Sequence, residues 1–333
     1  MKEETKYIFS KGDLSQKDFS IKFKNDTGNV YLPIKNVKEL YCFNEVTLSS
    51  KLLELFSKSG VILHFYGYYE NYIGTFYPND HYLSGKLTIA QAQAYTDKRM
   101  DIARVIVLGI SKNIHSTMYH YYRHDKKELK SFLDWLKSDC PVHISNTRDI
   151  KQLLSVEGQI WAMFYQNIRF VVPDAFIITK RVRRPPDNPM NALISFGNSL
   201  LYTKTITQIY RTHLNQTISF LHEPSEKRFS LSLDLSEVFK PIIVFKTIFE
   251  CINNRRIQTD KHFDKSLNYA MLNEDGKRIF IEAFENRLNL TFQHSGLKRK
   301  ISYKQAIRLD AYKLIKFIME GKPFIPFDFE ANR

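Results

Sequence analysis

The stretch YPNDHYLSGK, Tyr77–Lys86, decides how this chain is divided, because the residue pattern changes across it. Proline, asparagine, aspartate, serine and glycine gather here between two periodic segments, which is typical of a linker. Before it, apolar and polar residues alternate, as in β-strands; after it, apolar residues recur every three or four positions, as in helices. The sequence therefore predicts a multidomain α+β chain, with a strand-rich β domain at 1–85 and a larger all-α domain at 86–333.

The first part contains a predicted hairpin. Apolar residues alternate on both sides of the turn NDTG, Asn25–Gly28, at Phe19, Ile21, Phe23, Val30, Leu32 and Ile34. KELYCFN, residues 38–44, predicts another strand, and two more are expected around Gly67–Asn71. Between them, Thr47 or Ser49 can cap a short helix that Gly60 ends.

Helical periodicity dominates the second part of the chain. One long helix is expected to start at Thr88 and to run through Ile110. Further helices are expected at 126–139, 147–168, 189–213, 234–253, 274–290 and 302–320.

Composition narrows the class of protein. The 333 residues carry 49 Lys and Arg against 35 Asp and Glu, a formal charge of +14, and 14% aromatics. Such a charge indicates a polyanionic partner, most often nucleic acid; solubility and an acidic membrane surface remain alternatives. Three distant cysteines, Cys42, Cys140 and Cys251, imply no disulfide framework and no cysteine zinc site. With no apolar signal region or membrane-length segment, we expect a soluble cytoplasmic protein.

One carboxylate stands on an apolar helix face. In DIKQLLSVEGQIWAMFYQ, residues 149–166, Glu157 lies four residues after Leu153 and four before Trp161, so it points with the apolar stripe. A buried carboxylate is unfavourable unless it is paired or holds a metal ion. A partner arginine or a water-filled edge would also satisfy it.

Possible partners occur in FLHEPSEKRFSLSLDLSEVFKP, residues 220–241. His222 leaves an apolar segment, and Asp234 and Glu237 share one face of the helix they are expected to open. Carboxylates at a helix start also suit the helix dipole, which is the structural alternative. One histidine with two or three carboxylates suits Mg²⁺ or Mn²⁺ with open coordination positions.

A third stretch, KRVRRPPDNPMNALISFGNSLLY at 180–202, combines a basic run with a polar helix face. That face holds Asn191, Ser195, Asn198 and Tyr202, which line a site or bond to a neighbouring element. The basic run is a solvated loop or a phosphate clamp. Its cations are Lys180, Arg181, Arg183 and Arg184.

These segments, together with YLPIKNV (31–37) and GYYENYIGTFYP (67–78), resemble the CRISPR-associated Cas1 family of adaptation integrases. The resemblance covers nearly the whole chain. It is strongest to the type I-like bacterial branch that is often accompanied by Cas4. It implies an N-terminal β domain that forms a homodimer and a helical catalytic domain. Two such dimers are expected to flank a Cas2 dimer in a heterohexamer-like complex.

The family uses a glutamate, a histidine and an acidic residue to hold a metal ion. By resemblance, these catalytic and metal-binding positions fall on Glu157, His222 and Glu237. Asp234 matches a supporting acidic position; Glu237 is the preferred ligand, with Asp234 as the alternative. Asn191, Ser195 and Tyr202 are expected to support the site and to orient a metal-bound water or the DNA strand.

The expected activity is that of a metal-dependent DNA endonuclease and integrase in antiviral defence. With Mg²⁺ or Mn²⁺, it would insert captured DNA fragments as new spacers, a 3′-hydroxyl attacking a phosphodiester at the repeat boundary. The substrates are double-stranded and branched DNA. The residues predicted to bind this DNA are Lys180, Arg181, Arg183, Arg184, Arg228, Arg255 and Arg256.

Two other functions remain open from the sequence. A structure-selective, metal-dependent nuclease acting on branched DNA in repair would cut without joining. A non-catalytic DNA-binding scaffold would bind DNA without any metal-dependent activity. A protein of a membrane surface is a weaker third, because no basic amphipathic helix stands out.

Overall fold

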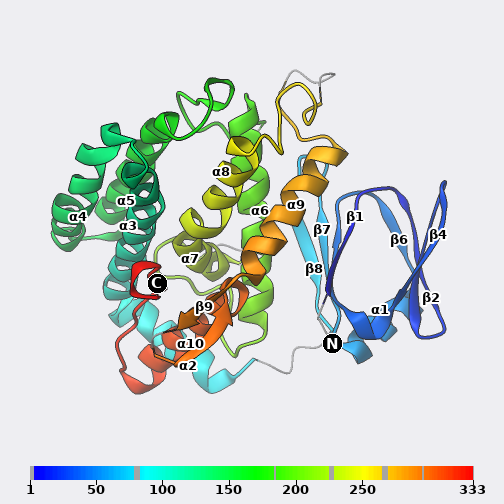
Figure 1. Ribbon diagram of the computed structural model, residues 1–333. Helices are drawn as coiled ribbons and strands as arrows, with labels where there is room; N and C mark the ends of the chain where they lie inside the picture. The colour runs from blue at the N-terminus through cyan, green and yellow to red at the C-terminus, as the bar shows by residue number, and fades with distance from the viewer. Residues whose placement is uncertain are drawn as a thin grey trace. The chain divides into compact units, whose positions relative to one another are not determined.

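A computed structural model describes residues 4–78, 83–183, 185–224, 229–264, 269–294 and 296–332 of the protein. The chain forms two compact units, residues 1–82 and 83–333. The first holds strands β1–β8 and one helix, and the second is mainly helical, which confirms the predicted fold class (Figure 1). The predictions for Arg184 and Arg228 lie outside the described residues.

Two four-stranded sheets build the first unit, in the orders β1–β5–β7–β8 and β4–β3–β2–β6. Apolar side chains from both sheets meet Leu52 and Phe56 of helix α1 in a single core. The strands are β1 (Glu4–Ile8), β2 (Gly12–Lys17), β3 (Ser20–Asn25), β4 (Gly28–Pro33), β5 (Val37–Cys42), β6 (Val46–Leu48), β7 (Ile62–Tyr66) and β8 (Tyr72–Phe76).

The hairpin predicted around Asn25–Gly28 is confirmed, since β3 and β4 pair antiparallel with Asn25 opposite Gly28. Gly28 has φ +137°, a backbone conformation that suits glycine. Phe19 departs from the expected alternation, because it precedes β3 and is 83% exposed. Helix α1 (Ser50–Ser59) is capped by Ser49, whose side chain accepts from the Leu52 N–H, and not by Thr47.

The long helix expected from Thr88 is in fact two helices. Helix α2 (Gly85–Asp97) ends at Lys98, whose φ of −128° and ψ of 12° are not helical, and α3 (Arg99–Arg123) begins at once. The remaining helices are α4 (Lys130–Ser145), α5 (Ile150–Asn167), α6 (Pro189–Tyr210), α7 (Ser230–Phe239), α8 (Lys246–Asn253), α9 (Glu274–Asn289) and α10 (Tyr303–Glu320). None of the helices in the described parts of the chain has the length and apolar character needed to cross a membrane.

Helix α7 begins at Ser230, four residues before the expected start. Asp234 and Glu237 therefore lie inside the helix, and a helix-dipole role at its first turn is excluded. Pro241 lacks an N–H, and a π-helix, Pro241–Phe245, separates α7 from α8. Helix α7 packs against α3, α6 and α10 and lies in the interior of the second unit (Figure 1).

The second unit is not entirely helical. Strands β9 (Thr291–His294) and β10 (Arg299–Ser302) form an antiparallel ribbon between α9 and α10. This ribbon was not among the predicted elements, because four-residue strands give too short an alternation to stand out beside two long helices.

Candidate metal site and its supports

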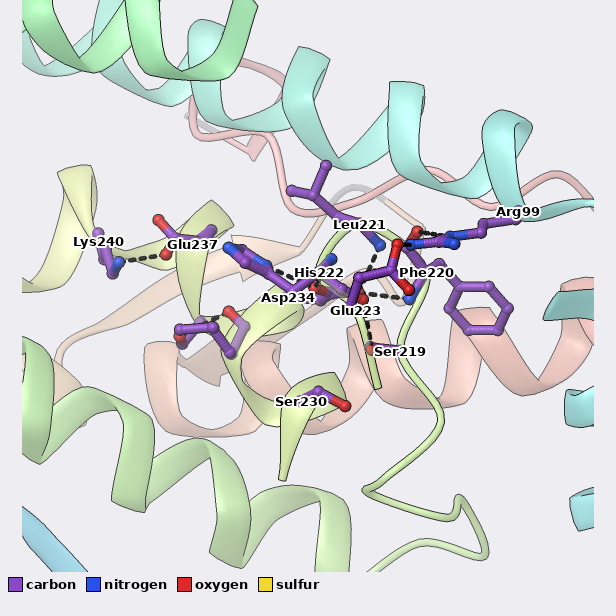
Figure 2. A network of polar contacts seen from close by, with 12 residues as sticks. Arg99, Ser219, Phe220, Leu221, His222, Glu223, Ser230, Asp234, Glu237 and Lys240 are labelled. Atoms are coloured by element: carbon purple, nitrogen blue, oxygen red, sulfur yellow. Dashed lines mark hydrogen bonds and ion pairs between the residues drawn. The ribbon is translucent and has the colours of Figure 1, made fainter. Parts of the chain in front are cut away.

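Asp234 organises the segment that carries His222. It is fully buried on α7, and its Oδ2 accepts the Phe220 and Leu221 N–H groups at 2.7 and 2.8 Å. Its Oδ1 accepts the His222 N–H at 3.0 Å and lies 2.8 Å from His222 Nδ1 (Figure 2). Both oxygens are therefore fully used by the protein. This contact holds the proton on Nδ1 and leaves Nε2 as the nitrogen that can bind a ligand.

The charge on His222 depends on the same partners. Burial lowers the pKa of the imidazole, but the hydrogen bond and charge of Asp234 raise it, with further help from Glu237 and Glu157. The net effect is a pKa above the ordinary value for histidine. His222 thus lies within electrostatic reach of both other predicted ligands.

The surroundings of Glu157 raise the pKa of its carboxyl group. Burial, followed by the charge of Glu237, raises its pKa to about 7. Lys240 and His222 act against this rise. Glu157 on α5 and Glu237 on α7, 80 positions apart in sequence, therefore lie near one another, as the predicted site requires.

Glu237 differs from Asp234 in how its oxygens are used. Its Oε1 forms an ion pair with the ammonium group of Lys240, three residues later. Its Oε2 is buried and has no hydrogen-bond partner among the described residues. A buried carboxylate oxygen without a partner is unfavourable, and a bound cation would satisfy it.

A second group of residues clamps the connection between α6 and α7. Arg99 donates to the Phe220 carbonyl at 2.9 Å and to Glu223 Oε1 at 2.6 Å (Figure 2). The Tyr95 hydroxyl donates to Glu223 Oε2 at 3.1 Å. These three contacts fix the backbone on both sides of His222. These contacts could not be predicted from the sequence, because Arg99 and Phe220 are 121 positions apart and no local pattern links them.

The polar face of α6 binds one cation of the basic run, Arg181, through hydrogen bonds. Arg181 donates to Asn191 Oδ1 at 3.1 Å and to Ser195 Oγ at 2.8 Å. The Tyr202 hydroxyl accepts the Phe229 N–H at 3.0 Å, just before α7. Of the two alternatives left open, bonding to neighbouring segments is the one observed for these three α6 residues.

Arg181 also approaches the predicted site from the side of α5. Burial lowers its pKa, while Tyr165 on α5 raises it by charge and by a side-chain hydrogen bond. Burial, opposed by Arg181, in turn raises the pKa of Tyr165, which also feels Glu237 and Glu157. Tyr165 was not among the predicted site residues, although it stands eight residues after Glu157 and therefore on the same helix face.

The other predicted DNA-binding residues have unequal surroundings. Lys180, Arg183 and Arg255 are exposed. Arg256 is ion-paired with Glu250 at 3.9 Å and with Glu282 at 3.3 Å, so part of its charge is already matched within the protein.

The donor set suits a hard divalent cation, although the side chains are not arranged around one point. Carboxylate oxygens with one imidazole are ligands typical of Mg²⁺ and Mn²⁺. Over the described residues, no group of three or more His, Cys, Asp or Glu side chains stands in a metal-holding arrangement. The unpartnered Glu237 Oε2, the oriented His222 and the electrostatically coupled Glu157 fit such an ion, provided that Lys240 gives way.

Comparisons with known proteins show which family this chain is similar to. The family described as "CRISPR associated protein Cas1" matches residues 6–286. A CRISPR-associated endonuclease Cas1 from Fusobacterium nucleatum is 40% identical over 324 residues, covering 96% of this chain and 95% of the relative. The structure of a CAS1 protein from Thermotoga maritima, 35% identical, covers 96% of this chain and 99% of that one with a TM-score of 0.84.

A more distant structure has the same fold. A casposase bound to integration product superposes with a TM-score of 0.85 over all of this chain and 96% of its own. Because the two sequences are only 19% identical, this likeness concerns the fold alone.

Proposed function

The chain belongs to the CRISPR-associated Cas1 family, and from this premise we propose that it is a metal-dependent DNA endonuclease and integrase of CRISPR adaptation. It would insert captured DNA fragments into the CRISPR array as new spacers. The observation that carries the proposal is the coupling of Glu157, His222 and Glu237, with Asp234 saturated by backbone contacts and Glu237 Oε2 left without a partner.

The proposed roles follow from how each oxygen and nitrogen is used. Glu157, His222 through Nε2 and Glu237 through Oε2 would hold Mg²⁺ or Mn²⁺, while Asp234 positions His222. A divalent ion held there would supply Lewis-acid polarisation of a phosphoryl oxygen. The preference for Glu237 over Asp234 is supported by the four contacts that already occupy Asp234.

The proposed reaction is a transesterification. The 3′-hydroxyl of the incoming strand forms a new bond to a phosphorus atom at the repeat boundary. The bond from that phosphorus to the 3′-oxygen of the target strand breaks, and the departing oxygen takes up a proton. Water in place of the 3′-hydroxyl gives hydrolysis, the endonuclease activity. Exposed Lys180 and Arg183 are the described cations proposed to bind the DNA backbone near this step.

Partners are proposed on the strength of the family. Cas2 is the expected protein partner, Cas4 an optional one, and the β-rich unit at 1–82 the expected homodimer contact. Asn191 and Ser195 are proposed to act through Arg181, and Tyr202 through the segment that enters α7.

The test is strand transfer in vitro. The protein, with its cognate Cas2, would be mixed with a labelled fragment and a supercoiled repeat plasmid in Mn²⁺, Mg²⁺ or EDTA. We expect metal-dependent joining that Glu157→Gln, His222→Ala and Glu237→Gln each abolish. Glu274→Gln, which removes an exposed carboxylate of α9, is the matched control and should join normally.

A fragment ending in a 3′-dideoxynucleotide separates the alternatives. Joining that requires the 3′-hydroxyl supports an integrase. Cutting that is unaffected by the 3′ end, with no joined product, would indicate a repair nuclease instead. DNA binding without either activity would indicate a scaffold.

A further inference from the structure

We propose that Lys240 is a built-in counter-ion of the metal site, which occupies the cation's place beside Glu237 in the metal-free protein and competes with a divalent ion for it. The inference rests on the proposed function, since the site is the one described above. It adds a residue that neither the sequence motifs nor the supporting contacts of His222 had assigned.

The ion pair is buried and comes from one short piece of chain. Lys240 follows α7 directly, three residues after Glu237, so the two side chains leave the same side of the helix. Only 15% of the Lys240 side chain and 6% of the Glu237 side chain are exposed. Figure 2 shows the ammonium group directed at Glu237. At this depth a carboxylate needs a cation, and the lysine supplies one.

The same ion pair restricts how a divalent ion can reach Glu237. The ammonium group holds Oε1 of Glu237, so a divalent ion can reach this carboxylate fully only if the lysine moves. The other oxygen, Oε2, stays without a hydrogen-bond partner among the described residues. Two cations at one carboxylate repel each other, so lysine and metal ion exclude one another in part.

The ammonium group also lies beside an aromatic ring. In the position in which it pairs with Glu237, the Lys240 Nζ lies 5.8 Å from the centre of the Trp161 ring, whose face attracts cations. Trp161 stands one helical turn after Glu157 on α5, so the ring borders the predicted site. Lys240 therefore connects the α7 side of this site with its α5 side.

The experiment measures Mn²⁺ binding to the DNA-free protein by the electron paramagnetic resonance signal of free Mn²⁺. For Lys240→Met, which keeps the length and removes the charge, we expect Mn²⁺ to bind about tenfold more tightly. The metal-free variant should unfold at a lower temperature than the wild type, and saturating Mn²⁺ should raise its unfolding temperature by more. Lys240→Arg, which keeps the charge, should bind Mn²⁺ as the wild type does.

A matched control exists on α10. Lys313 pairs with buried Asp310 at the same three-residue spacing, with 2.8 Å between Nζ and Oδ1. Lys313→Met should lower the unfolding temperature with and without Mn²⁺ and leave Mn²⁺ affinity unchanged. If Lys240→Met fails to fold, Lys240→Gln, which retains an amide donor for Glu237, replaces it.

Two outcomes would count against the inference in different ways. If Glu157→Gln abolishes Mn²⁺ binding but Lys240→Met binds Mn²⁺ no more tightly than the wild type, the metal site stands and the counter-ion role is wrong. If the wild type shows no Glu157-dependent Mn²⁺ binding, the proposed metal site is itself overturned, and this inference with it.

Discussion

Asp234 and Glu237 lie one helical turn apart on α7, and their hydrogen bonds separate their roles. Asp234 accepts three successive backbone N–H groups and contacts His222 Nδ1, so it shapes the segment before α7. Glu237 contacts a lysine through one oxygen and keeps the other without a partner in the described structure. The first is suited to positioning a ligand and the second to being one.

We therefore expect Asp234→Asn to weaken Mn²⁺ binding by about 10- to 100-fold, the usual effect of removing a carboxylate that orients a ligating histidine. The amide can no longer accept all four hydrogen bonds, so unfolding should also become easier by about 1–3 kcal/mol. Mn²⁺ titration and chemical denaturation measure the two effects. Asp310→Asn on α10, another buried aspartate, should lower stability alone; an equal decrease of Mn²⁺ affinity there would contradict the assignment.

Glu157 predicts a pH dependence of stability. Burial and the charge of Glu237 raise its pKa to about 7, above the ordinary value of 4.5. Between these two pH values the folded chain holds a proton that the unfolded chain has released. The contribution of Glu157 to the free energy of unfolding is therefore present below pH 4.5 and is lost as pH rises towards 7.

In EDTA, Glu157→Gln should remove this pH dependence and raise the free energy of unfolding at pH 8 by about 1–3 kcal/mol relative to the wild type. At pH 4.5 the two proteins should differ little. Urea denaturation at both pH values is the measurement. A variant that is equally stabilised at both would show that the effect is not due to ionisation of Glu157.

At the scale of elements, helix α3 ties the end of α7 to the C-terminal segment. The Asn113 side chain donates to the carbonyls of Val238 and Phe327, both at 2.9 Å, and accepts the Phe329 N–H at 3.0 Å. One turn later, Thr117 donates to the Pro241 carbonyl at 3.2 Å. These contacts lie where the helix changes from α to π geometry, so they hold the end of α7 that carries Glu237.

Asn113→Ala should lower the free energy of unfolding by about 3 kcal/mol, because it leaves buried backbone groups without partners. Hydrogen exchange should accelerate most in α7 and in residues 324–330. The control is Ser138→Ala on α4, whose exposed hydroxyl donates to the Asp134 carbonyl of the same helix. A decrease in stability of similar size in both variants would contradict the special role of the Asn113 hydrogen bonds.

At the scale of the whole molecule, the charge of +14 predicts DNA binding that weakens steeply with salt. Which cations contribute depends on where they lie. The β9–β10 ribbon exposes Lys298, Arg299 and Lys300, for which no ion pair is seen among the described residues. By contrast, Lys58, Arg278 and Lys322 are each paired with a nearby glutamate.

We expect a weaker salt dependence when Lys298, Arg299 and Lys300 are replaced by glutamine. The slope of log affinity against log salt concentration should become less steep by about 1 for each DNA phosphate that the variant no longer neutralises. Replacing Lys58, Arg278 and Lys322 by glutamine removes the same amount of charge and should change this slope less. Fluorescence anisotropy with a labelled duplex at several salt concentrations makes the comparison. Equal slopes for the two variants would mean that net charge, and not this ribbon, governs binding.

Much of the architecture follows from local pattern. The change of period at Tyr77–Lys86, the Asn25–Gly28 hairpin and the Ser49 cap are set by neighbours within a few residues, which is why sequence reasoning found them. The break at Lys98, the true start of α7 and the β9–β10 ribbon were missed. At Lys98, contacts made by a distant segment, such as Arg99 with Phe220, outweigh local propensity. Strands β9 and β10 have only four residues each, too few for their alternation to be recognised.

The sequence by itself determined the change from a strand-rich to a mainly helical part, the basic charge and the candidate residues Glu157, His222, Asp234 and Glu237, since these depend on composition and local pattern. That the candidate residues form one metal site was implied only by the resemblance to the Cas1 family. Only the tertiary structure decided which atoms those residues contact. Hydrogen bonds and ion pairs join atoms that are close in space whatever their separation in sequence. Four such contacts occupy Asp234, Arg181 is held by α6, and Lys240 stands at Glu237 where a metal ion is expected.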